Sequence, residues 1–182
     1  AATQAIGEAY RAIADGAFDL LISGGFDSMV NPLGVGGFCM LEVLSRSNHL
    51  QGEASRPFHA ARDGFVLGEG SGILILEELE AALTRKAPIL AEIVGYASTM
   101  DAYRVSDPAE GHAYAVWAME RAIADSGLPK TAIDYINAHG TGTRKNDPGE
   151  VQAIQQVFGP LADHIPVSSI KSQIGHLIGA AG

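Results

Sequence analysis

The stretch IDYINAHGTGTRKNDPGEVQAIQQVF, residues 133–158, decides the fold class of this chain. It begins with a short apolar run, 133–140, that is typical of a buried β-strand. A polar loop with closely spaced glycines follows, and residues 147–158 then have the pattern of a helix. Strands that alternate with helices along a chain form α/β layered folds. The stretch therefore predicts an α/β fold.

The rest of the chain shows the same alternation of strand and helix patterns, which extends the α/β prediction to the whole sequence. Apolar residues at three- and four-residue steps predict helices, and short apolar runs between glycines predict buried strands. Residues 27–69 contain most of the Gly and Pro turn signals, so we expect a long irregular excursion with short helices there. Further helices are expected at 1–16 and 113–126, further strands at 18–25, 87–99 and 165–170, and a buried strand that runs into a helix at 72–87.

The composition excludes several classes of protein. The chain has 182 residues, of which 47% are hydrophobic and 18% are charged, as expected for a globular core. Its 12 Lys and Arg against 21 Asp and Glu give a net charge of -9, so we expect neither nucleic acid nor an anionic membrane as a partner. The longest uncharged run, residues 28–41, falls short of the roughly 20 residues needed to cross a bilayer.

A single cysteine, Cys39, limits the redox chemistry and the metal sites available to the chain. One thiol cannot form an internal disulfide or a cysteine-based zinc site, so we expect a reducing, cytoplasmic compartment. Cys39 lies in an apolar run without a nearby base, which favours buried packing over a role as nucleophile. Four histidines have no metal-ligand spacing and are interpreted as surface or loop residues: His49, His59, His112 and His164.

The loop that follows the strand at 133–140 carries the strongest candidate site. If the loop is extended, His139, Thr141 and Thr143 point to one side, because side chains alternate along an extended chain. The glycines between them would leave the backbone open to a narrow, extended ligand. An alternative is that this segment is only a corner between a strand and a helix, and the local sequence leaves both interpretations open.

The helix after this loop begins with a typical start signal. Asp147, Pro148, Gly149 and Glu150 fit the N-cap and the first three positions of a helix. Glu150 is placed to complete a capping box, in which it and Asp147 bind N–H groups at the start of their own helix.

A second cluster, SSIKSQIGHLIGAAG at residues 168–182, contains Lys171 and His176 in a turn rich in serine and glycine. In isolation, these two residues are best interpreted as solvated loop residues. However, His139 and His176 both follow predicted strands, and α/β proteins bind ligands at the carboxyl ends of neighbouring parallel strands. The fold could therefore bring the two histidines together in an active site.

Six blocks of sequence, taken in their order and spacing, resemble the β-ketoacyl-[acyl-carrier-protein] synthases of the thiolase superfamily, most of all the long-chain condensing enzymes of bacterial fatty acid synthesis. The blocks are IGEAYRAI, LISGG, PLGVGGF, SRPF…RDGFVLGEGSGILILEE, AHGTGT…ND…E and SSIKSQIGHLIGAAG, and they cover the whole chain. The resemblance implies a five-layered αβαβα thiolase-like fold of two similar halves, here incomplete. Residues 1–95 would end the first half, with the pocket and a dimer-side excursion, and residues 96–182 would begin the second half, with the His/Lys/His residues.

The resemblance implies an acyltransferase that performs a decarboxylative Claisen condensation. In this reaction an acyl group is loaded on a cysteine, and malonyl-[acyl-carrier protein] loses CO₂ to give a carbanion equivalent that attacks the acyl thioester. His139 and His176 match the two histidines that face the malonyl thioester carbonyl, which requires neutral imidazoles whose N–H groups stabilise the enolate oxygen. Lys171 matches the family lysine, and Glu150 matches the carboxylate with which that lysine pairs.

Further residues match the family's substrate contacts. Thr141 and Thr143 match the threonines that hydrogen-bond the phosphopantetheine arm of the acyl carrier protein, and Phe38 matches the aromatic residue that lines the acyl pocket. The resemblance implies a cytoplasmic homodimer with acyl carrier protein as its partner. It implies no metal or redox cofactor, because the substrates are carried on the phosphopantetheine of the carrier protein.

Two departures from the family pattern bear on activity. The nucleophilic cysteine would fall two positions before Ala1, and the glycine-rich loop that completes the oxyanion hole would lie beyond Gly182. We therefore expect an internal fragment that is inactive in condensation on its own. A ketosynthase of a polyketide or aryl-polyene pathway is one alternative. A non-catalytic partner subunit like the chain-length factors is another, but such subunits often alter the histidines that are retained here.

Overall fold

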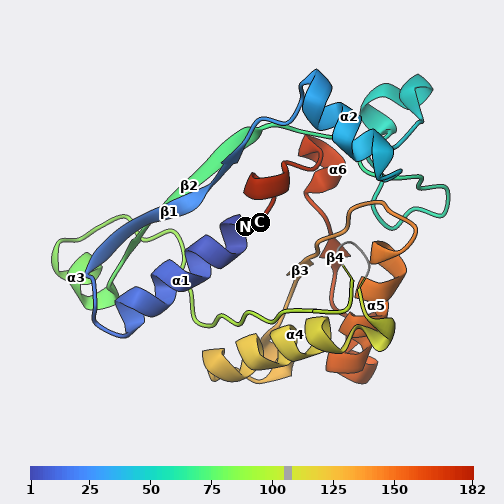
Figure 1. Ribbon diagram of the computed structural model, residues 1–182. Helices are drawn as coiled ribbons and strands as arrows, with labels where there is room; N and C mark the ends of the chain where they lie inside the picture. The colour runs from blue at the N-terminus through green and yellow to red at the C-terminus, as the bar shows by residue number, and fades with distance from the viewer. Residues whose placement is uncertain (105–107) are drawn as a thin grey trace.

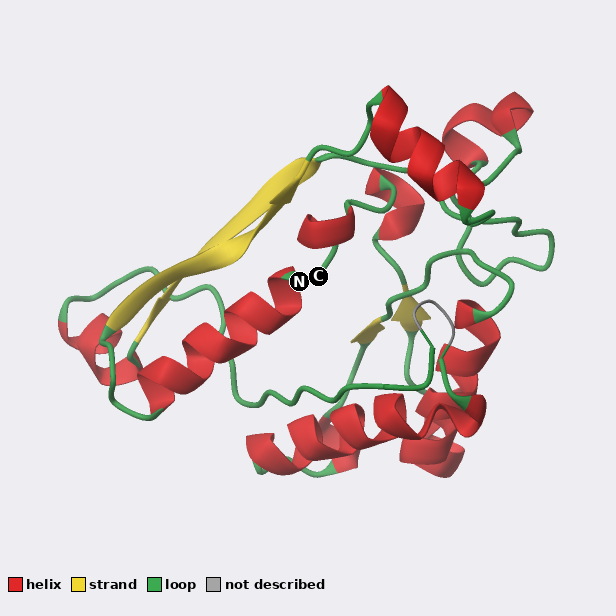
Figure 2. Ribbon diagram, in the orientation of Figure 1, coloured by secondary structure: helices red, strands yellow, loops and turns green. Residues whose placement is uncertain are grey.

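Helices and strands alternate along the chain, as the sequence predicts (Figures 1 and 2). The computed structural model describes residues 1–104 and 108–182. The predicted helices at 1–16, 113–126 and 147–158 are confirmed to within two residues. The helices are α1 (Ala2–Ala14), α2 (Pro32–Met40), α3 (Leu79–Thr84), α4 (Ala113–Ser126), α5 (Asn146–Phe158) and α6 (Lys171–Ile174), and the strands are β1 (Leu20–Asp27), β2 (Gly70–Glu77), β3 (Ile136–Asn137) and β4 (Val167–Ser168). Short 3₁₀ helices lie at Asn48–Glu53, Glu110–His112, Lys130–Ala132, Gly159–Asp163 and Ile178–Ala180.

The N-terminal part of the chain is a long antiparallel pair of strands with a helix packed against it. β1 and β2 pair from Leu20 opposite Glu77 to Asp27 opposite Gly70. α1 lies along this pair (Figure 1). It forms because its apolar residues recur at helical spacing, and it ends just before Gly16, whose φ of +74° favours glycine. The predicted strand at 18–25 and the predicted strand-to-helix segment at 72–87 are therefore confirmed as elements.

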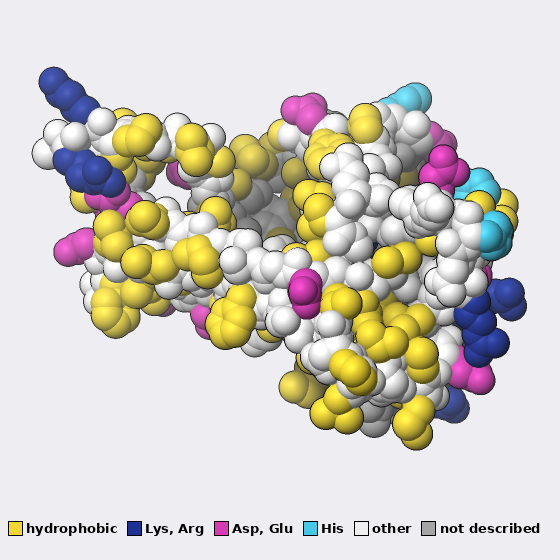
Figure 3. Space-filling model, turned by 90° about the horizontal axis from the view of Figure 1, so that it is seen from above, with side chains coloured by type: hydrophobic (Ala, Val, Ile, Leu, Met, Phe, Trp, Pro, Cys, Tyr) yellow, Lys and Arg dark blue, Asp and Glu magenta, His cyan; other side chains and the backbone are white. Residues whose placement is uncertain are grey.

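These two strands are less buried than the sequence predicts. On one face of β1, Ile22 is 69% exposed and Phe26 is 79% exposed. Figure 3 shows hydrophobic side chains on the surface of the narrower left part of the molecule, which holds β1, β2 and α1. In the described residues, β1 and β2 pair only with each other. The prediction of buried strands is wrong here, because an apolar strand is buried on both sides only when layers cover both faces of its sheet.

The described residues 87–99 form no strand, so the prediction made from their period of two is wrong. Their backbone groups bind side chains instead of a neighbouring strand. The N–H of Tyr96 donates to Asp125 at 2.8 Å, and the carbonyl of Tyr96 accepts from the Arg11 guanidinium at 3.4 Å. An alternating pattern produces a strand only where a partner strand supplies the hydrogen bonds, and no strand of the described chain pairs with this segment.

The C-terminal part of the chain is built around α4 and α5, whose apolar faces share one core (Figure 1). Gly127, in a left-handed conformation with a φ of +67°, ends α4 where the sequence predicts. The core is formed by three residues of α5, three of α4, two near β3 and three that follow α5. They are Ile154, Val157 and Phe158; Val116, Met119 and Ile123; Ile133 and Ile136; and Leu161, Ala162 and Ile165. This core fixes the position of α5, whose first turn faces the site described below.

The short strands β3 and β4 pair in parallel, with Asn137 opposite Ser168. The predicted strands at 133–140 and 165–170 are therefore confirmed in position but are only two residues long. Because the pair is parallel, the loops that follow both strands leave from the same edge. The two clusters that the sequence singles out meet at this edge.

The mixture of paired strands and packed helices agrees with the α/β class. The division of the chain at residue 95 into two similar halves stays a prediction. None of the helices in residues 1–104 and 108–182 combines the length and the apolar character that a membrane span requires.

Candidate active site

Two histidines from distant parts of the sequence meet at the carboxyl edge of β3 and β4. His139 lies two residues beyond β3, and His176 follows α6. Their ring centroids are 5.5 Å apart and the rings are nearly perpendicular, at 88°. His176 is held by backbone hydrogen bonds, since its N–H donates to Val66 at 2.7 Å and its carbonyl accepts from Gly68 at 3.0 Å. The prediction that the fold brings these two histidines together is confirmed.

Both histidines are neutral at pH 7. The pKa of His176 is lowered from 6.5 to about 4, first by desolvation and then by electrostatic interaction with His139 and Lys171, while Asp27 acts in the opposite direction. The pKa of His139 is also lowered, first by desolvation and then by the charge of Lys171. Ile178 donates its backbone N–H to Nδ1 of His176 at 3.0 Å. A neutral His176 therefore carries its proton on Nε2, which makes no hydrogen bond within residues 1–104 and 108–182 and can donate to a ligand.

The start of α1 lies close to this histidine pair. A Cβ on Gly25 of β1 would come within 2.9 Å of the Ala2 side chain in α1 and within 2.7 Å of the carbonyl of Gly179, in the turn after His176. Asp27, at the end of β1, accepts the N–H of Gly179 at 3.0 Å and so ties β1 to the turn after His176. Figure 1 shows both ends of the chain side by side at the centre of the molecule. The site therefore lies where the start of α1, the end of β1 and the turns after β3 and α6 meet.

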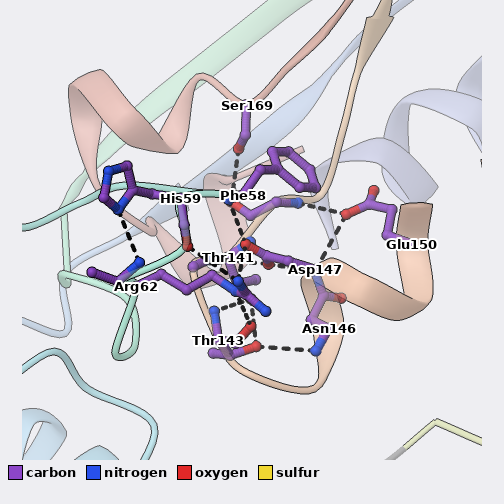
Figure 4. A network of polar contacts seen from close by, with 12 residues as sticks. Phe58, His59, Arg62, Thr141, Thr143, Asn146, Asp147, Glu150 and Ser169 are labelled. Atoms are coloured by element: carbon purple, nitrogen blue, oxygen red, sulfur yellow. Dashed lines mark hydrogen bonds and ion pairs between the residues drawn. The ribbon is translucent and has the colours of Figure 1, made fainter. Parts of the chain in front are cut away.

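Two carboxylates on the first turn of α5 shape the loop that carries His139 (Figure 4). Glu150 accepts the backbone N–H groups of His139 at 2.5 Å and of Gly140 at 2.7 Å. One oxygen of Asp147 accepts the N–H groups of Thr141 and Gly142, both at 3.1 Å. These contacts turn both side chains away from their own helix and toward the loop.

The predicted capping box of Asp147 and Glu150 is therefore wrong. α5 begins at Asn146 after Lys145, without a side-chain cap. The second oxygen of Asp147 accepts the N–H of Phe58 at 2.7 Å, although Phe58 is far away in the sequence. Buried backbone N–H groups require acceptors. The N–H groups of the loop and of Phe58 donate to the two carboxylates, which the local sequence pattern places at the start of the helix.

Lys171 is buried beside these residues, with only 3% of its surface exposed. Desolvation lowers its pKa, while the negative charges of Glu150 and Asp147 act in the opposite direction. The direct ion pair expected between Lys171 and Glu150 is not formed in the described part of the chain, because the oxygens of Glu150 are occupied by backbone N–H groups. Lys171 and Glu150 therefore interact by long-range electrostatic attraction and not by a direct contact.

Thr141 and Thr143 point to the same side, and their hydroxyl oxygens are 2.9 Å apart. This agrees with the prediction, but for a different reason. The loop is not extended, since Gly140 and Gly142 have left-handed φ angles of +38° and +77°. These glycines also do not leave space for a ligand: a Cβ on Gly140 would come within 2.5 Å of the side chain of Ser169. Glycine is needed here because other parts of the protein approach the loop closely.

Aromatic residues connect the candidate pocket to the histidine pair. Phe38, on α2, packs edge-on against Phe65 with ring centroids 5.6 Å apart, and Phe65 packs against His176 at 4.8 Å. Phe65 is not among the residues predicted from the sequence, although it lies within the RDGFVLGEG block that matches the family. Cys39 is exposed on the short helix α2, so the prediction that it is buried is wrong. An apolar run was not enough to bury it, because several of its apolar neighbours on α2 are exposed as well.

Comparison with known families and proteins identifies close relatives. Residues 1–82 match the family described as "Beta-ketoacyl synthase, N-terminal domain", and residues 90–182 match "Beta-ketoacyl synthase, C-terminal domain". The chain is 49% identical to the 3-oxoacyl-[acyl-carrier-protein] synthase 2 of Synechocystis sp. over 182 residues, which are 100% of this chain and 44% of that protein. It is 44% identical to the protein of the same name from Staphylococcus aureus over 180 residues, or 99% of this chain and 44% of that protein. The chain thus spans less than half the length of these relatives.

Solved structures agree with the sequence matches. A ketosynthase solved in complex with its type II polyketide synthase acyl-carrier protein superimposes with a TM-score of 0.94 at 41% identity, over 99% of this chain and 44% of that one. A β-ketoacyl synthase from Burkholderia phymatum superimposes with a TM-score of 0.93 at 41% identity, over 100% of this chain and 43% of that one. With both family domains matched and the fold shared with solved ketosynthases, the chain belongs to the β-ketoacyl synthase family and has part of its thiolase-like α/β fold.

Proposed function

We propose that this site catalyses the decarboxylative Claisen condensation of an acyl thioester with malonyl-[acyl-carrier protein] in fatty acid elongation. The observation that carries the proposal is the pair of neutral histidines, His139 and His176, with rings 5.5 Å apart beside the start of α1. The relatives at 44% and 49% identity, which are named 3-oxoacyl-[acyl-carrier-protein] synthase 2, support this substrate class.

Decarboxylation is the step that the two histidines would promote. The bond between the malonyl methylene carbon and its carboxylate breaks, CO₂ leaves, and the electron pair moves toward the thioester oxygen to form an enolate. Neutral imidazoles can each donate one N–H hydrogen bond to that oxygen as its negative charge develops. In His176 the donor is Nε2, because Nδ1 already accepts the N–H of Ile178.

Condensation is the second step. The enolate carbon attacks the carbonyl carbon of an acyl group held on a cysteine, a carbon–carbon bond forms, the carbon–sulfur bond breaks, and the cysteine leaves as thiolate. The family resemblance places this cysteine two positions before Ala1. The start of α1 lies close to the turn after His176, so a residue just before α1 would lie near the enolate. A helix N-terminus would also favour the thiolate form of that cysteine.

The remaining site residues have supporting roles in this proposal. Thr141 and Thr143 hydrogen-bond the phosphopantetheine arm of the carrier protein, and Phe38 lines the acyl pocket. Lys171 and Glu150 set the charge and the orientation of the site. The chemistry uses no metal or redox cofactor, and the enzyme acts as a cytoplasmic homodimer.

A ketosynthase of a polyketide pathway is a second candidate. It is favoured by the similarity to a ketosynthase solved with its type II polyketide synthase carrier protein, which is 41% identical to this chain. The product separates the two candidates. Fatty acid elongation gives a single condensation for each acyl chain supplied, whereas a polyketide synthase repeats the condensation on unreduced β-keto chains.

The test uses the complete gene product that contains these 182 residues. Release of labelled CO₂ from malonyl-carrier protein is measured for the wild type and for His139→Ala and His176→Ala, with His164→Ala, an exposed histidine in the turn after α5, as the matched control. Loss of one oxyanion donor should slow decarboxylation by roughly a hundredfold or more. His164→Ala should have no effect. Unchanged CO₂ release in both site variants would refute the proposal.

A further inference from the structure

Arg62 lies outside the residues that the sequence singles out, yet it contacts the candidate substrate loop, residues 139–143, directly (Figure 4). Its Nε donates to the carbonyl of Thr143 at 3.0 Å and lies 3.5 Å from a carboxylate oxygen of Asp147. Its Nη1 donates to the carbonyl of His59 at 3.1 Å. We propose that Arg62 is a positioning residue, which holds the loop 139–143 in the shape that binds the carrier arm. This inference rests on the proposed function.

The loop needs an external support because of its backbone conformation. Gly140 and Gly142 are both in the left-handed region, and the N–H groups of Thr141 and Gly142 point to the same oxygen of Asp147. The loop is also joined to the rest of the protein by the N–H of Gly64, which donates to the carbonyl of Gly142 at 3.0 Å. The hydrogen bonds of Asp147 therefore determine where both threonines lie.

Asp147 depends on Arg62 in turn. Only 1% of the surface of Asp147 is exposed, and a buried carboxylate without a cation nearby is strongly unfavourable. Among the described residues, Arg62 is the cation within ion-pair distance of Asp147. Without Arg62, the Asp147 carboxylate would lose this ion pair and turn toward water or other donors, which would weaken its bonds to Thr141 and Gly142.

Arg62 thus acts on both ends of the threonine pair. It reaches Thr141 through Asp147, and it reaches Thr143 through a direct hydrogen bond to the carbonyl. The planar guanidinium serves three acceptors at once from fixed directions, which a lysine ammonium at the end of a flexible chain does only in part. Substitution by lysine should therefore preserve the charge but only part of the geometry.

Arg56 provides a matched comparison in the same turn. It also pairs with an aspartate, Asp63, at 3.7 Å, and donates to the hydroxyl of Ser47 at 3.1 Å. Its side chain is 23% exposed, against 17% for Arg62. None of its hydrogen bonds or ion pairs within the described residues involves the loop 139–143. Replacing Arg56 removes a similar Arg–Asp pair without touching the candidate substrate loop.

The experiment compares Arg62→Ala, Arg62→Lys and Arg56→Ala in the complete gene product. Malonyl decarboxylation is measured with malonyl-pantetheine and with the malonyl thioester of N-acetylcysteamine, which lacks most of the carrier arm. Arg62→Ala should raise KM for malonyl-pantetheine by roughly tenfold and change KM for the short thioester much less. Arg62→Lys should recover part of the loss. Arg56→Ala should lower the melting temperature but keep the wild-type ratio of the two KM values.

The outcomes separate this inference from the proposed function. A wild-type ratio of KM values in Arg62→Ala, or an equal change of the ratio in Arg56→Ala, would overturn the positioning role. If Arg62→Ala does not fold, the ratio in Arg62→Lys decides, and a wild-type value overturns the inference. A wild-type enzyme that turns over neither thioester overturns the proposed function, and the positioning role with it.

Discussion

Acid should destabilise the folded protein through His176. Desolvation, together with smaller effects of nearby charges, lowers the pKa of this histidine in the folded state from 6.5 to about 4. Between these pH values the unfolded chain therefore binds a proton that the folded chain does not. Stability therefore rises with pH across this window and is lost as the pH falls through it. A pKa lowered from 6.5 to about 4 corresponds to about 3 kcal/mol, because each tenfold change in proton affinity is worth about 1.4 kcal/mol.

The measurement compares the wild type with His176→Gln, which cannot titrate. Urea unfolding followed by circular dichroism gives the free energy of unfolding of both proteins at pH 7 and near pH 4. The wild type should lose about 3 kcal/mol more than His176→Gln over this range. NMR of ¹³C-labelled histidine should place the titration of His176 well below the ordinary histidine pKa of 6.5.

Equal losses of stability in the two proteins would refute this reasoning, as would a His176 resonance that titrates at its ordinary pH. The causes can also be separated. Lys171→Met removes a nearby positive charge and should raise the pKa of His176, whereas Asp27→Asn removes a negative charge and should lower the pKa further. A pKa that responds to neither variant would exclude both charges as causes of the shift.

Three further predictions concern single positions. Intact-mass analysis after incubation with an acyl-carrier-protein thioester should show no stoichiometric acyl group on Cys39, because the acylated cysteine is proposed to lie before Ala1. A stoichiometric adduct on Cys39 would contradict this. Gly149→Ala should reduce the free energy of unfolding by about 1–3 kcal/mol, because the new methyl group would overlap the ring of His112, and an unchanged urea midpoint would exclude this overlap. Phe38→Ala should shift condensation toward longer or bulkier acyl chains with decarboxylation nearly unchanged. If melting instead shows a loss of about 3–5 kcal/mol and the acyl ranking is unaltered, Phe38 is only a core residue.

The elements that the sequence predicts correctly are those with local causes. α4 begins and ends where its apolar spacing and Gly127 predict, and α1 ends just before Gly16. The errors concern features that depend on distant partners. The segment 87–99 has a strand pattern but no strand beside it in the described chain, and the apolar side chains of β1 are exposed where no layer covers them. Burial and pairing are properties of the assembled layers and cannot be read from one segment.

In the candidate site, too, the sequence predicts correctly what has a local cause and fails where a side chain contacts a distant segment. The sequence places His139 and His176 at the ends of neighbouring strands, and the parallel pairing of β3 with β4 confirms this. Asp147, in contrast, has the sequence pattern of a helix cap, but in the structure its carboxylate accepts N–H groups of the loop and of Phe58. A capping pattern is local, but the N–H groups that compete for the carboxylate come from a segment far away in the chain. Arg62 was missed for the same reason, since its contacts with Thr143 and Asp147 cross between two loops.

The hydrogen bonds of the two carboxylates also bear on the protonation of the histidines. Glu150 and Asp147 raise the pKa of His139, and a carboxylate in direct contact with the ring would favour the charged imidazolium. Both carboxylates instead accept backbone N–H groups of the loop, so neither makes a hydrogen bond to an imidazole in the described part of the chain. Desolvation and the charge of Lys171 then outweigh their attraction, and His139 stays neutral. The contacts that shape the loop therefore also preserve the protonation state that donation to an enolate oxygen requires.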